Sequence, residues 1–137
     1  MRVLFDTNVL LDTLLAREPF VADAAFLLET VESGQVEGFM SATTVTDVHY
    51  LVGRQTKSAE IAIAAVTQLL ALMEICAVDR SVLEQAITLR LTDFEDAVQV
   101  ASAIKLGLEA IITRDVHGFT GSPIPVLSSK EMRNQLM

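Results

Sequence analysis

The sequence contains four aspartates whose surroundings favour metal-assisted chemistry: Asp6, Asp47, Asp96 and Asp115. Asp6 directly follows the apolar run Val3–Phe5, where a carboxylate is costly unless it is paired, hydrogen-bonded or bound to a metal. Carboxylates held close together raise one another's pKa, and a hard divalent cation such as Mg²⁺ relieves that repulsion through oxygen ligands. Two such ions about 3.5–4 Å apart would activate water against a phosphodiester. The four acids therefore suggest phosphodiester hydrolysis.

The hydrophobic periodicity predicts strands that alternate with helices. The expected strands cover residues 2–5, 38–41, 74–78, 110–113 and 125–127. The expected helices cover residues 8–16, 20–33, 43–52, 58–73, 81–91 and 92–106, with a further helix at the C-terminus. This alternation implies right-handed crossovers and a parallel sheet of about four to five strands covered on both faces. We therefore expect an α/β protein, a three-layer α/β/α sandwich, with one domain over residues 1–137.

A parallel sheet would bring the four acids to one edge. Asp6 ends the first strand, Asp47 lies in the helix after the second, and Asp115 follows the fourth. Asp96 lies near the start of the helix that leads into that fourth strand. Ligands of open parallel sheets bind beyond the carboxyl ends of the strands, where these positions converge. The topology thus predicts an acidic site at this edge.

Several acids also have a structural interpretation. Thr92 and Glu95 form the T-x-x-E pattern of a capping box, and the helix dipole alone would favour Asp93 there. Asp12 lies inside the first helix and is interpreted as a solvated acid. Asp96 lies one turn further into its helix than the cap requires, which favours a role in the site.

Asp47 and Asp115 keep both interpretations. Asp47 could pair with Arg54, seven residues further on. Asp115 could be an ordinary turn residue after Arg114, because Asp favours turns.

Polar neighbours of the acids give weaker signals. Asn8 could orient Asp6 or cap the helix that begins beside it. Thr113 ends a strand, where it could bond an acid or a phosphate. His49 and His117 have no Cys or His partner at ligand spacing, so structural roles are favoured for both.

Composition narrows the class of protein. The chain has 137 residues, a net charge of −8 and one cysteine, Cys76, which excludes an intrachain disulfide. Asp6 and Asp12 interrupt any signal-peptide core, so a cytoplasmic protein is expected. The longest uncharged run, Ile61–Met73, is shorter than the roughly 20 residues of a membrane helix. The acidic balance alone argues against non-specific binding to a polyanion.

The segment 58–73 also bears on partners. Between Ile61 and Met73 only Thr67 and Gln68 are polar. A helix that is apolar nearly all round is buried nearly all round, so it is either covered by a second copy of the chain or placed in the centre of the core. We favour a homodimer.

Four segments together resemble the signature regions of PIN domains: VLFDTNVLLDTLLAREPF, SATTVTDVHYL, DFEDAVQVASA and AIITRDVHGF. The likeness spans about residues 2–127 and follows the order and spacing of the family. The resemblance implies a Mg²⁺- or Mn²⁺-dependent ribonuclease. It also implies a VapC-like toxin with an antitoxin protein as partner.

The resemblance also assigns roles to residues. The four family acids match Asp6, Asp47, Asp96 and Asp115, while Asn8 and Thr113 match common polar neighbours and Asp93 matches an extra acid. The second acid is more often Glu in toxin members. Because Asp47 is one methylene shorter, its direct ligation stays open, and the expected metal ligands are Asp6, Asp96 and Asp115.

RNA binding must then overcome the acidic net charge. The cations that could surround the site are Arg17, Arg54, Lys57, Arg90 and Arg114, although solvated surface positions suit each of them. Weak, salt-sensitive binding is expected, and a small structured RNA fits better than a long single strand, because the chain lacks aromatic platforms for stacking bases.

Two alternatives come from other classes. A degenerate PIN fold could serve as an interaction module without catalysis, and a metal titration would separate the two. A phosphatase or receiver domain with a phosphorylated aspartate would need a second acid near Asp6. Position 8 is Asn, which argues against this class.

Overall fold

The central sheet is parallel throughout and has five strands in the order β3-β2-β1-β4-β5. The computed structural model describes residues 1–137. The strands are β1 (Arg2–Phe5), β2 (Glu37–Ser41), β3 (Glu74–Cys76), β4 (Ala110–Ile112) and β5 (Val126–Leu127). In the middle of the sheet, Leu4 of β1 is paired with Phe39 of β2 and Ile111 of β4. The predicted parallel sheet is confirmed.

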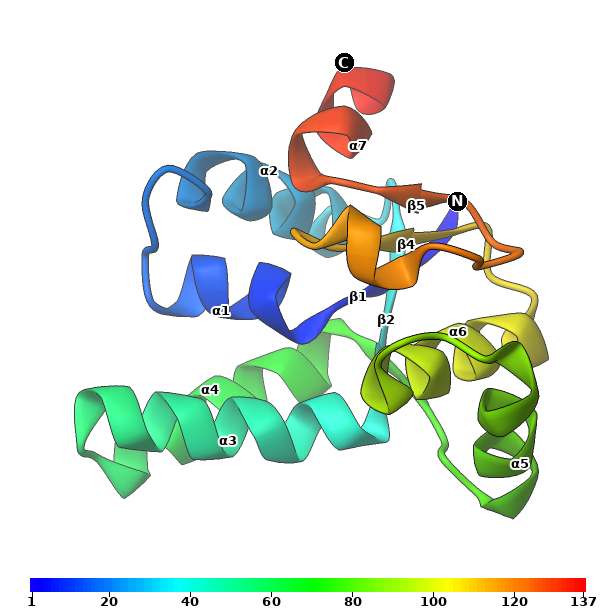
Figure 1. Cartoon of the computed structure of the whole chain (residues 1–137). Coiled ribbons are helices and arrows are strands. Elements are labelled where there is room, and N and C mark those ends of the chain that lie inside the picture. Colours follow the sequence, from blue (N-terminus) through cyan, green and yellow to red (C-terminus); the bar gives the residue numbers. More distant parts are fainter.

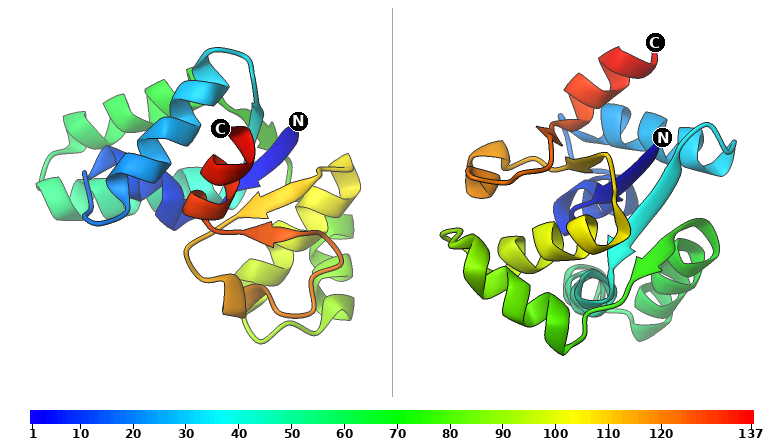
Figure 2. Two further views of the ribbon diagram at one scale, coloured as in Figure 1. Left: turned by 90° about the horizontal axis from the view of Figure 1, so that it is seen from above. Right: turned by 90° about the vertical axis from the view of Figure 1, so that its right-hand side faces the viewer.

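Helices cover both faces of this sheet, as Figures 1 and 2 show. They are α1 (Thr7–Leu14), α2 (Val21–Glu32), α3 (Ala42–Thr56), α4 (Ala59–Leu72), α5 (Arg80–Leu89), α6 (Phe94–Leu106) and α7 (Ser129–Leu136), with a 3₁₀ turn η1 (Val116–Phe119). Core residues of α1 to α4 and α7 form one cluster with the sheet, and α6 covers the opposite face with α5 packed against it. The three-layer α/β/α sandwich is confirmed.

The alternation of side chains along β1 explains the two layers. Val3 and Phe5 belong to the larger core with α1 and α2, whereas Leu4 belongs to the core beneath α6. Burying a side chain of this size contributes about 1.5–3 kcal/mol. Cys76 lies in the second core, and burial raises its thiol pKa to about 11, so it acts as a small hydrophobic residue.

The beginning of α6 differs from the expected capping box. The N-cap is Asp93, whose extended backbone lets its carboxylate accept a 3.1 Å hydrogen bond from the Asp96 amide. The prediction that Thr92 and Glu95 form the cap is wrong, because Asp93 itself satisfies the free N–H group. Glu95 is thereby left free to point elsewhere.

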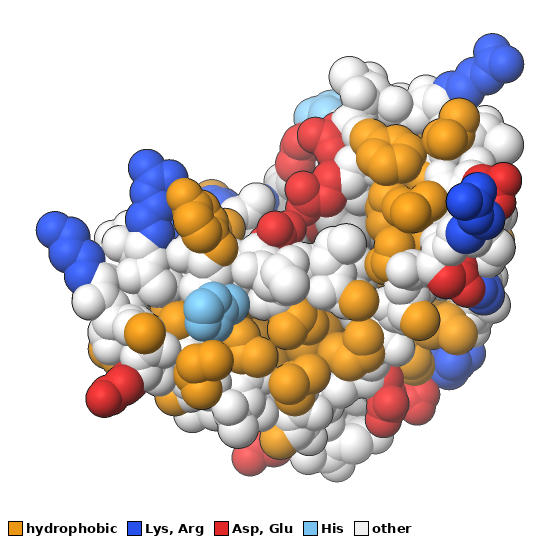
Figure 3. Space-filling model, turned by 90° about the horizontal axis from the view of Figure 1, so that it is seen from below, with side chains coloured by type: hydrophobic (Ala, Val, Ile, Leu, Met, Phe, Trp, Pro, Cys, Tyr) orange, Lys and Arg blue, Asp and Glu red, His pale blue; other side chains and the backbone are white.

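Helix α4 lies at the surface, so its interpretation as a central core helix is wrong. Ala62, Ala65 and Leu69 are buried within the core cluster that includes α3 residues. Ile63 on its outer side is 56% exposed, and Leu70 is 49% exposed. Hydrophobic side chains are visible on the underside of the molecule, where α3 and α4 lie (Figure 3). None of the helices has both the length and the apolar character needed to cross a membrane.

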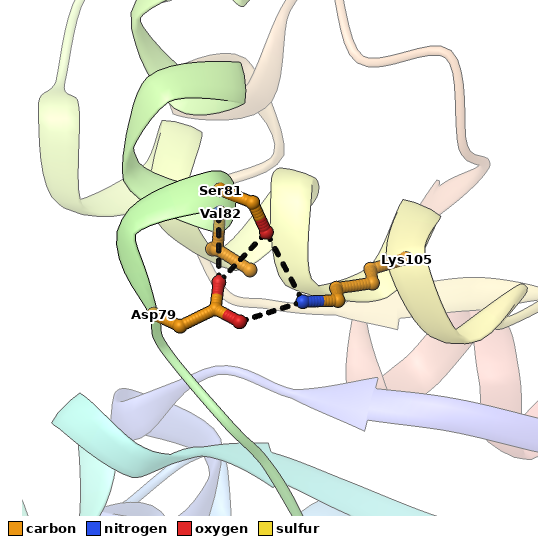
Figure 4. Close-up of polar contacts among 4 residues, drawn as sticks. All are labelled: Asp79, Ser81, Val82 and Lys105. Atoms are coloured by element: carbon orange, nitrogen blue, oxygen red, sulfur yellow. Dashed lines mark hydrogen bonds and ion pairs between the residues drawn. The ribbon is translucent and has the colours of Figure 1, made fainter.

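A polar contact fixes α5 against α6 (Figure 4). The Asp79 carboxylate caps α5 by accepting a 3.1 Å bond from the Val82 amide, and it accepts a 2.8 Å bond from Lys105 Nζ near the end of α6. Ser81 Oγ also donates to Asp79 at 2.8 Å. These donors, Lys105 first, hold the pKa of Asp79 well below its ordinary value. The contact joins the start of α5 to the last part of α6, at the opposite end of that helix from Asp96.

A candidate acidic site at the carboxyl edge of the sheet

The four predicted acids line a single cleft beyond the carboxyl ends of β1, β2 and β4. Its volume is about 420 Å³, and it is lined by Asp6, Thr7, Asn8, Asp47, Tyr50, Leu51, Asp93, Glu95, Asp96 and Asp115. Acidic side chains gather in a hollow between two raised parts of the surface (Figure 3). The structure thus brings together acids that are up to 109 residues apart, from Asp6 to Asp115.

Asp6 is the most buried of these acids and is held by three donors. The strand ends at Phe5, and Asp6 then adopts the extended conformation of the α1 N-cap. Its Oδ1 accepts 2.8 Å bonds from the Thr7 amide and from Gln99 Nε2. Its Oδ2 accepts a 2.8 Å bond from Thr113 Oγ1. All three donors are neutral, so they orient the carboxylate and leave its charge unbalanced.

Asp96 lies in the first turn of α6 and faces other acids. Burial is the main cause that raises its pKa to about 7, and the charges of Asp6, Asp93 and Asp115 raise it further. Because Asp96 has no basic partner, a bound cation would stabilise its ionised form and lower this pKa.

Asp115 approaches Asp96 across Gly118. Its Oδ1 accepts a 3.0 Å bond from the Gly118 amide, which caps η1. The Asp115 amide in turn donates to Thr113 Oγ1 at 3.0 Å. A Cβ atom added to Gly118 would lie 2.6 Å from Asp115 Oδ2 and 3.0 Å from Asp96 Oδ2. Glycine at this position therefore leaves the space in which the two carboxylates meet.

Asp47 and Glu95 form a second acidic pair in the cleft. Asp47 comes from α3 and Glu95 from the first turn of α6. A hydrogen bond with Asp47 is the main cause that raises the pKa of Glu95 to about 7, followed by burial and by the charge of Asp47. The Glu95 carboxyl group therefore titrates near neutral pH beside Asp47. The sequence signal for Glu95 was hidden by its apparent role in a cap.

The supporting residues have different positions. Thr113 bonds both Asp6 and the Asp115 amide, and Asp93 caps α6. Asn8 lies inside α1 and accepts a 3.3 Å bond from Arg17, so it neither caps the helix nor bonds Asp6.

The remaining polar candidates fall outside the cleft, and one buried residue had no sequence signal. His49 and His117 are exposed, and neither lines the cleft. Gln99, which bonds Asp6, was not predicted, because an amide inside an apolar helix face gives no motif.

The prediction that Asp12 is a solvated helix acid is wrong. Its side chain is 0% exposed, and its carboxylate lies 3.3 Å from Arg114 Nε. Burial raises the pKa of Asp12, while Arg114 and Arg17 act in the opposite direction. The Arg114 guanidinium also lies 4.3 Å from the centre of the Phe20 ring. Arg114 therefore turns toward the interior, although the next residue, Asp115, faces the cleft.

The carboxylates suit a cation that is also held by water and substrate. No group of three or more His, Cys, Asp or Glu side chains converges closely enough to hold a metal ion by itself. Mg²⁺ is usually bound by one or two carboxylates together with waters and substrate phosphates. Asp96 and Asp115, which meet beside Gly118, provide such a pair, and the donors on Asp6 keep a third carboxylate oriented nearby.

The fold and the acidic cleft together are those of a small α/β/α domain with its site at the sheet edge, and comparison with known proteins identifies the family. A family model described as PIN domain matches residues 2–117. The chain therefore belongs to the PIN domain family, as the four sequence segments indicated. No curated protein matches the sequence.

Solved structures of similar fold come from several bacteria. A toxin–antitoxin complex from Klebsiella pneumoniae is 24% identical, with a TM-score of 0.69 over 93% of this chain and 97% of that one. VapBC2 from Rickettsia felis, bound to a promoter DNA fragment, is 14% identical, with a TM-score of 0.69 over 93% and 98%. The sarcin–ricin loop cleaving toxin VapC20 of Mycobacterium tuberculosis is 20% identical, with a TM-score of 0.64 over 80% and 86%.

Proposed function

We propose that this PIN domain is a metal-dependent endoribonuclease, a hydrolase of RNA phosphodiester bonds. The observation that carries the proposal is the approach of Asp96 and Asp115 across Gly118 without a basic partner. The chain places a cation beside buried acids elsewhere, as Arg114 beside Asp12 demonstrates. Acids left together without such a partner favour a site that takes its positive charge from a ligand.

The roles of the residues follow from their contacts. Asp6, Asp96 and Asp115 would hold Mg²⁺ or Mn²⁺, and Asp47 would act through a water molecule or through Glu95. The bound ion supplies an activated water and neutralises charge that develops on the phosphate. Thr113 fixes both Asp6 and the Asp115 backbone, so it sets the distance between two ligands. The raised pKa of Glu95, beside Asp47 in the cleft, makes Glu95 the candidate for proton transfer to or from the reacting groups.

RNA is the proposed substrate, and cations beside the cleft are proposed to bind its phosphates. Arg17 reaches Asn8 at the cleft wall. Arg54 and Lys57 lie at the exposed end of α3, the helix that carries Asp47. Because the whole chain has a charge of −8, binding should be weak and should weaken further as salt increases. A cytoplasmic location suits this substrate and the single buried thiol.

An antitoxin protein is the proposed regulatory partner, since several similar structures are toxin–antitoxin complexes. An open groove of about 590 Å³ between α1, α2 and α4 offers a surface for it. Leu28 and Leu72 supply apolar surface to this groove. Glu29 and Glu32 also line it, and their carboxylates would accept hydrogen bonds from basic side chains of the antitoxin.

A homodimer is also proposed, with the outer face of α4 as the interface. Ile63 and Leu70 are seven residues apart, so they lie on one side of this helix, and both are about half exposed. A second copy would remove this apolar surface from water.

A cleavage assay tests the enzymatic proposal. Wild type, Asp6→Asn, Asp96→Asn and the control Asp79→Asn are incubated with a mixed pool of tRNA and ribosomal RNA, with Mg²⁺, Mn²⁺ or EDTA. We expect discrete products from wild type and Asp79→Asn with either metal, and none with EDTA. Loss of a ligand should lower the rate by about 10³-fold, because several kcal/mol of charge stabilisation is removed. Equal products from wild type and both site variants would contradict the proposal.

The second candidate function is an interaction module without catalysis. The lack of a preformed group of three metal-binding side chains favours it. Calorimetric titration with Mn²⁺ separates the two: the nuclease should bind Mn²⁺ and lose this binding in Asp96→Asn, whereas the interaction module should show no binding in either protein.

A further inference from the structure

We propose that Gln99 is a positioning residue that fixes Asp6 for metal binding, an inference that rests on the proposed nuclease function. Its Nε2 donates a 2.8 Å hydrogen bond to Asp6 Oδ1 across 93 residues of sequence. The side chain is 1% exposed, so water cannot replace this donor without a change in packing. Gln99 is not one of the four acids that match the family, and its side chain does not line the cleft.

The position of Gln99 on α6 links two candidate ligands. Asp96 and Gln99 are three residues apart, and residues at this spacing lie on neighbouring positions of one helix face. One side chain of α6 therefore enters the cleft, while the other grips the carboxylate that ends β1. Any shift of α6 would move Asp96 and loosen Asp6 at the same time. Helix α6 thus carries Asp96 directly and also holds Asp6 through Gln99, so its position determines the distance between the two acids.

Counting the acceptor sites of Asp6 explains why a third donor matters. An ionised carboxylate offers about four lone-pair sites. The Thr7 amide, Gln99 and Thr113 occupy three of them. About one site then remains for a ligand, and its direction is fixed because the other three are held. Without Gln99, Oδ1 would keep only the Thr7 amide, and the carboxylate could turn.

The other half of the Gln99 amide argues against a purely structural role. Its Oε1 is buried and has no hydrogen-bond partner. An unpaired buried acceptor disfavours folding, and every other residue from Ala97 to Ala101 is apolar. Only Nε2 can donate to a carboxylate, so turning the amide over cannot satisfy Oε1 without losing Asp6. A residue selected for stability alone at this position would be apolar.

The test replaces Gln99 by Met, which has a similar length and no donor. Mn²⁺ affinity is measured by calorimetry, and the midpoint of thermal unfolding is measured in EDTA. We expect Mn²⁺ to bind about 10–100-fold more weakly, as is typical when a partner of a metal ligand is lost. The unfolding midpoint should change little, because the lost donor and the removed unpaired acceptor have opposite effects. Ser102→Ala is the matched control, since Ser102 is a buried polar residue one turn along α6 that bonds only Val98.

A double-mutant cycle separates positioning from general damage. If Gln99 acts through Asp6, then Gln99→Met should weaken Mn²⁺ binding in wild type but cause no further loss in Asp6→Asn. An equal loss in both backgrounds would overturn the inference, as would unchanged affinity in Gln99→Met. If the Met variant does not fold, Gln99→Asn withdraws the amide by one methylene and should also weaken binding, and wild-type affinity in this variant would refute the inference.

The outcomes also separate this inference from the proposed function. Wild type that binds Mn²⁺ but cleaves no RNA would refute the nuclease function, while the affinity of Gln99→Met would still decide the role of Gln99. Wild type that binds neither Mn²⁺ nor Mg²⁺ would overturn both.

Discussion

Helices α5 and α6 begin with the same kind of cap, yet the acids at their starts are in opposite electrostatic states. In each helix an aspartate accepts a 3.1 Å bond from the amide three residues further on, Asp79 from Val82 and Asp93 from Asp96. At α5 the bond from Lys105 lowers the pKa of Asp79. At α6 burial and three neighbouring acids raise the pKa of Asp96 to about 7. The difference lies in the neighbours supplied by the fold, since both caps are alike.

The same contrast appears within α1 and its cap. Asp6 and Asp12 are both buried, but Asp12 has Arg114 at 3.3 Å, whereas Asp6 is held only by neutral donors. The fold therefore distinguishes a buried acid that is paired with a cation of the chain from a buried acid that is oriented by neutral donors alone. The second kind, Asp6, lines the cleft. Positive charge is therefore missing beside the cleft acids and not beside the buried acids of the chain in general. Variants of the paired and of the unpaired acids test this difference.

The largest expected effect comes from removing the cation of a paired acid. Arg114→Met leaves Asp12 buried without a partner, and breaking such a pair costs about 3 kcal/mol of the free energy of unfolding. Urea denaturation at neutral pH measures the loss. Lys130→Met, an exposed residue, is the control and should have little effect. The double variant Asp12→Leu/Arg114→Met should recover most of the loss, and a double variant no more stable than Arg114→Met would contradict this account.

The second prediction concerns the unpaired acids and pH. The Asp96 pKa of about 7 lies above its ordinary value of 3.8, so between these values the folded protein holds a proton that the unfolded chain has lost. The metal-free protein should therefore lose stability as pH rises through this window. Glu95, with a pKa of about 7, acts in the same direction. Thermal unfolding in EDTA from pH 4 to pH 8, compared with Asp96→Asn, isolates the contribution of Asp96.

Metal should reverse this loss. At about 100 times its dissociation constant, a ligand that binds only the folded state adds about 2.7 kcal/mol. We expect this gain from Mn²⁺ at pH 8 and little of it at pH 5, where Asp96 is protonated. A gain of equal size at both pH values, or in Asp96→Asn, would contradict the proposed ligand role.

A smaller effect is expected at the glycine between the two carboxylates. Gly118→Ala places a Cβ atom 2.6 Å from Asp115 Oδ2 and 3.0 Å from Asp96 Oδ2, so the acids must move apart. Mn²⁺ binding should weaken about tenfold, which is about 1.4 kcal/mol. Gly53→Ala in α3 is the control, because its nearest neighbour would lie at an ordinary 3.5 Å. Tighter binding in Gly118→Ala would indicate that the acids stand too far apart in the wild type.

Much of the fold followed from the sequence because its apolar residues change period at each element. All five strands and the parallel topology were predictable, and β1 and α1 were placed within a residue or two. Helix ends were harder to place. Helix α3 continues to Thr56, four residues beyond its apolar pattern, because Lys57 adopts a left-handed conformation that ends it. A single backbone angle decides such an end, and hydrophobic periodicity carries no information about it.

The four acids of the candidate site were predictable because the order of elements places each of them at the carboxyl edge of the sheet. Asp6, Asp47 and Asp115 come after strands, and Asp96 lies near the start of the helix that leads into β4. Gln99 and Glu95 were not predictable, because their roles depend on the rotation of α6 relative to β1 and α3. The Asp12–Arg114 pair joins residues 102 positions apart, a contact that no local pattern specifies. Burial of a single helix acid depends on such tertiary contacts.

The smallest expected effect tests the paired side of the comparison. Lys105→Met removes the ammonium group from Asp79, but both side chains are about half exposed, at 46% and 53%. Such a pair contributes little, so the unfolding midpoint should fall only slightly. The difference from wild type should vanish in about 1 M salt, where the screening length is about 3 Å. It should also begin to shrink as pH falls below the ordinary Asp pKa of 3.8, and it should be lost fully only below the depressed pKa of Asp79 in the folded protein.

The Mn²⁺ affinity of Lys105→Met tests whether the paired acid of α5 is independent of the unpaired acids of α6. If Asp79 and Lys105 neutralise each other within the fold, Lys105→Met should bind Mn²⁺ as tightly as wild type, although the residue lies on the same helix as Asp96. A clear loss of affinity would mean that the contact between α5 and α6 holds the cleft in shape. The paired acid at the start of α5 would then affect the geometry of the unpaired acids at the start of α6. The two groups of acids would differ in charge but would not be structurally independent.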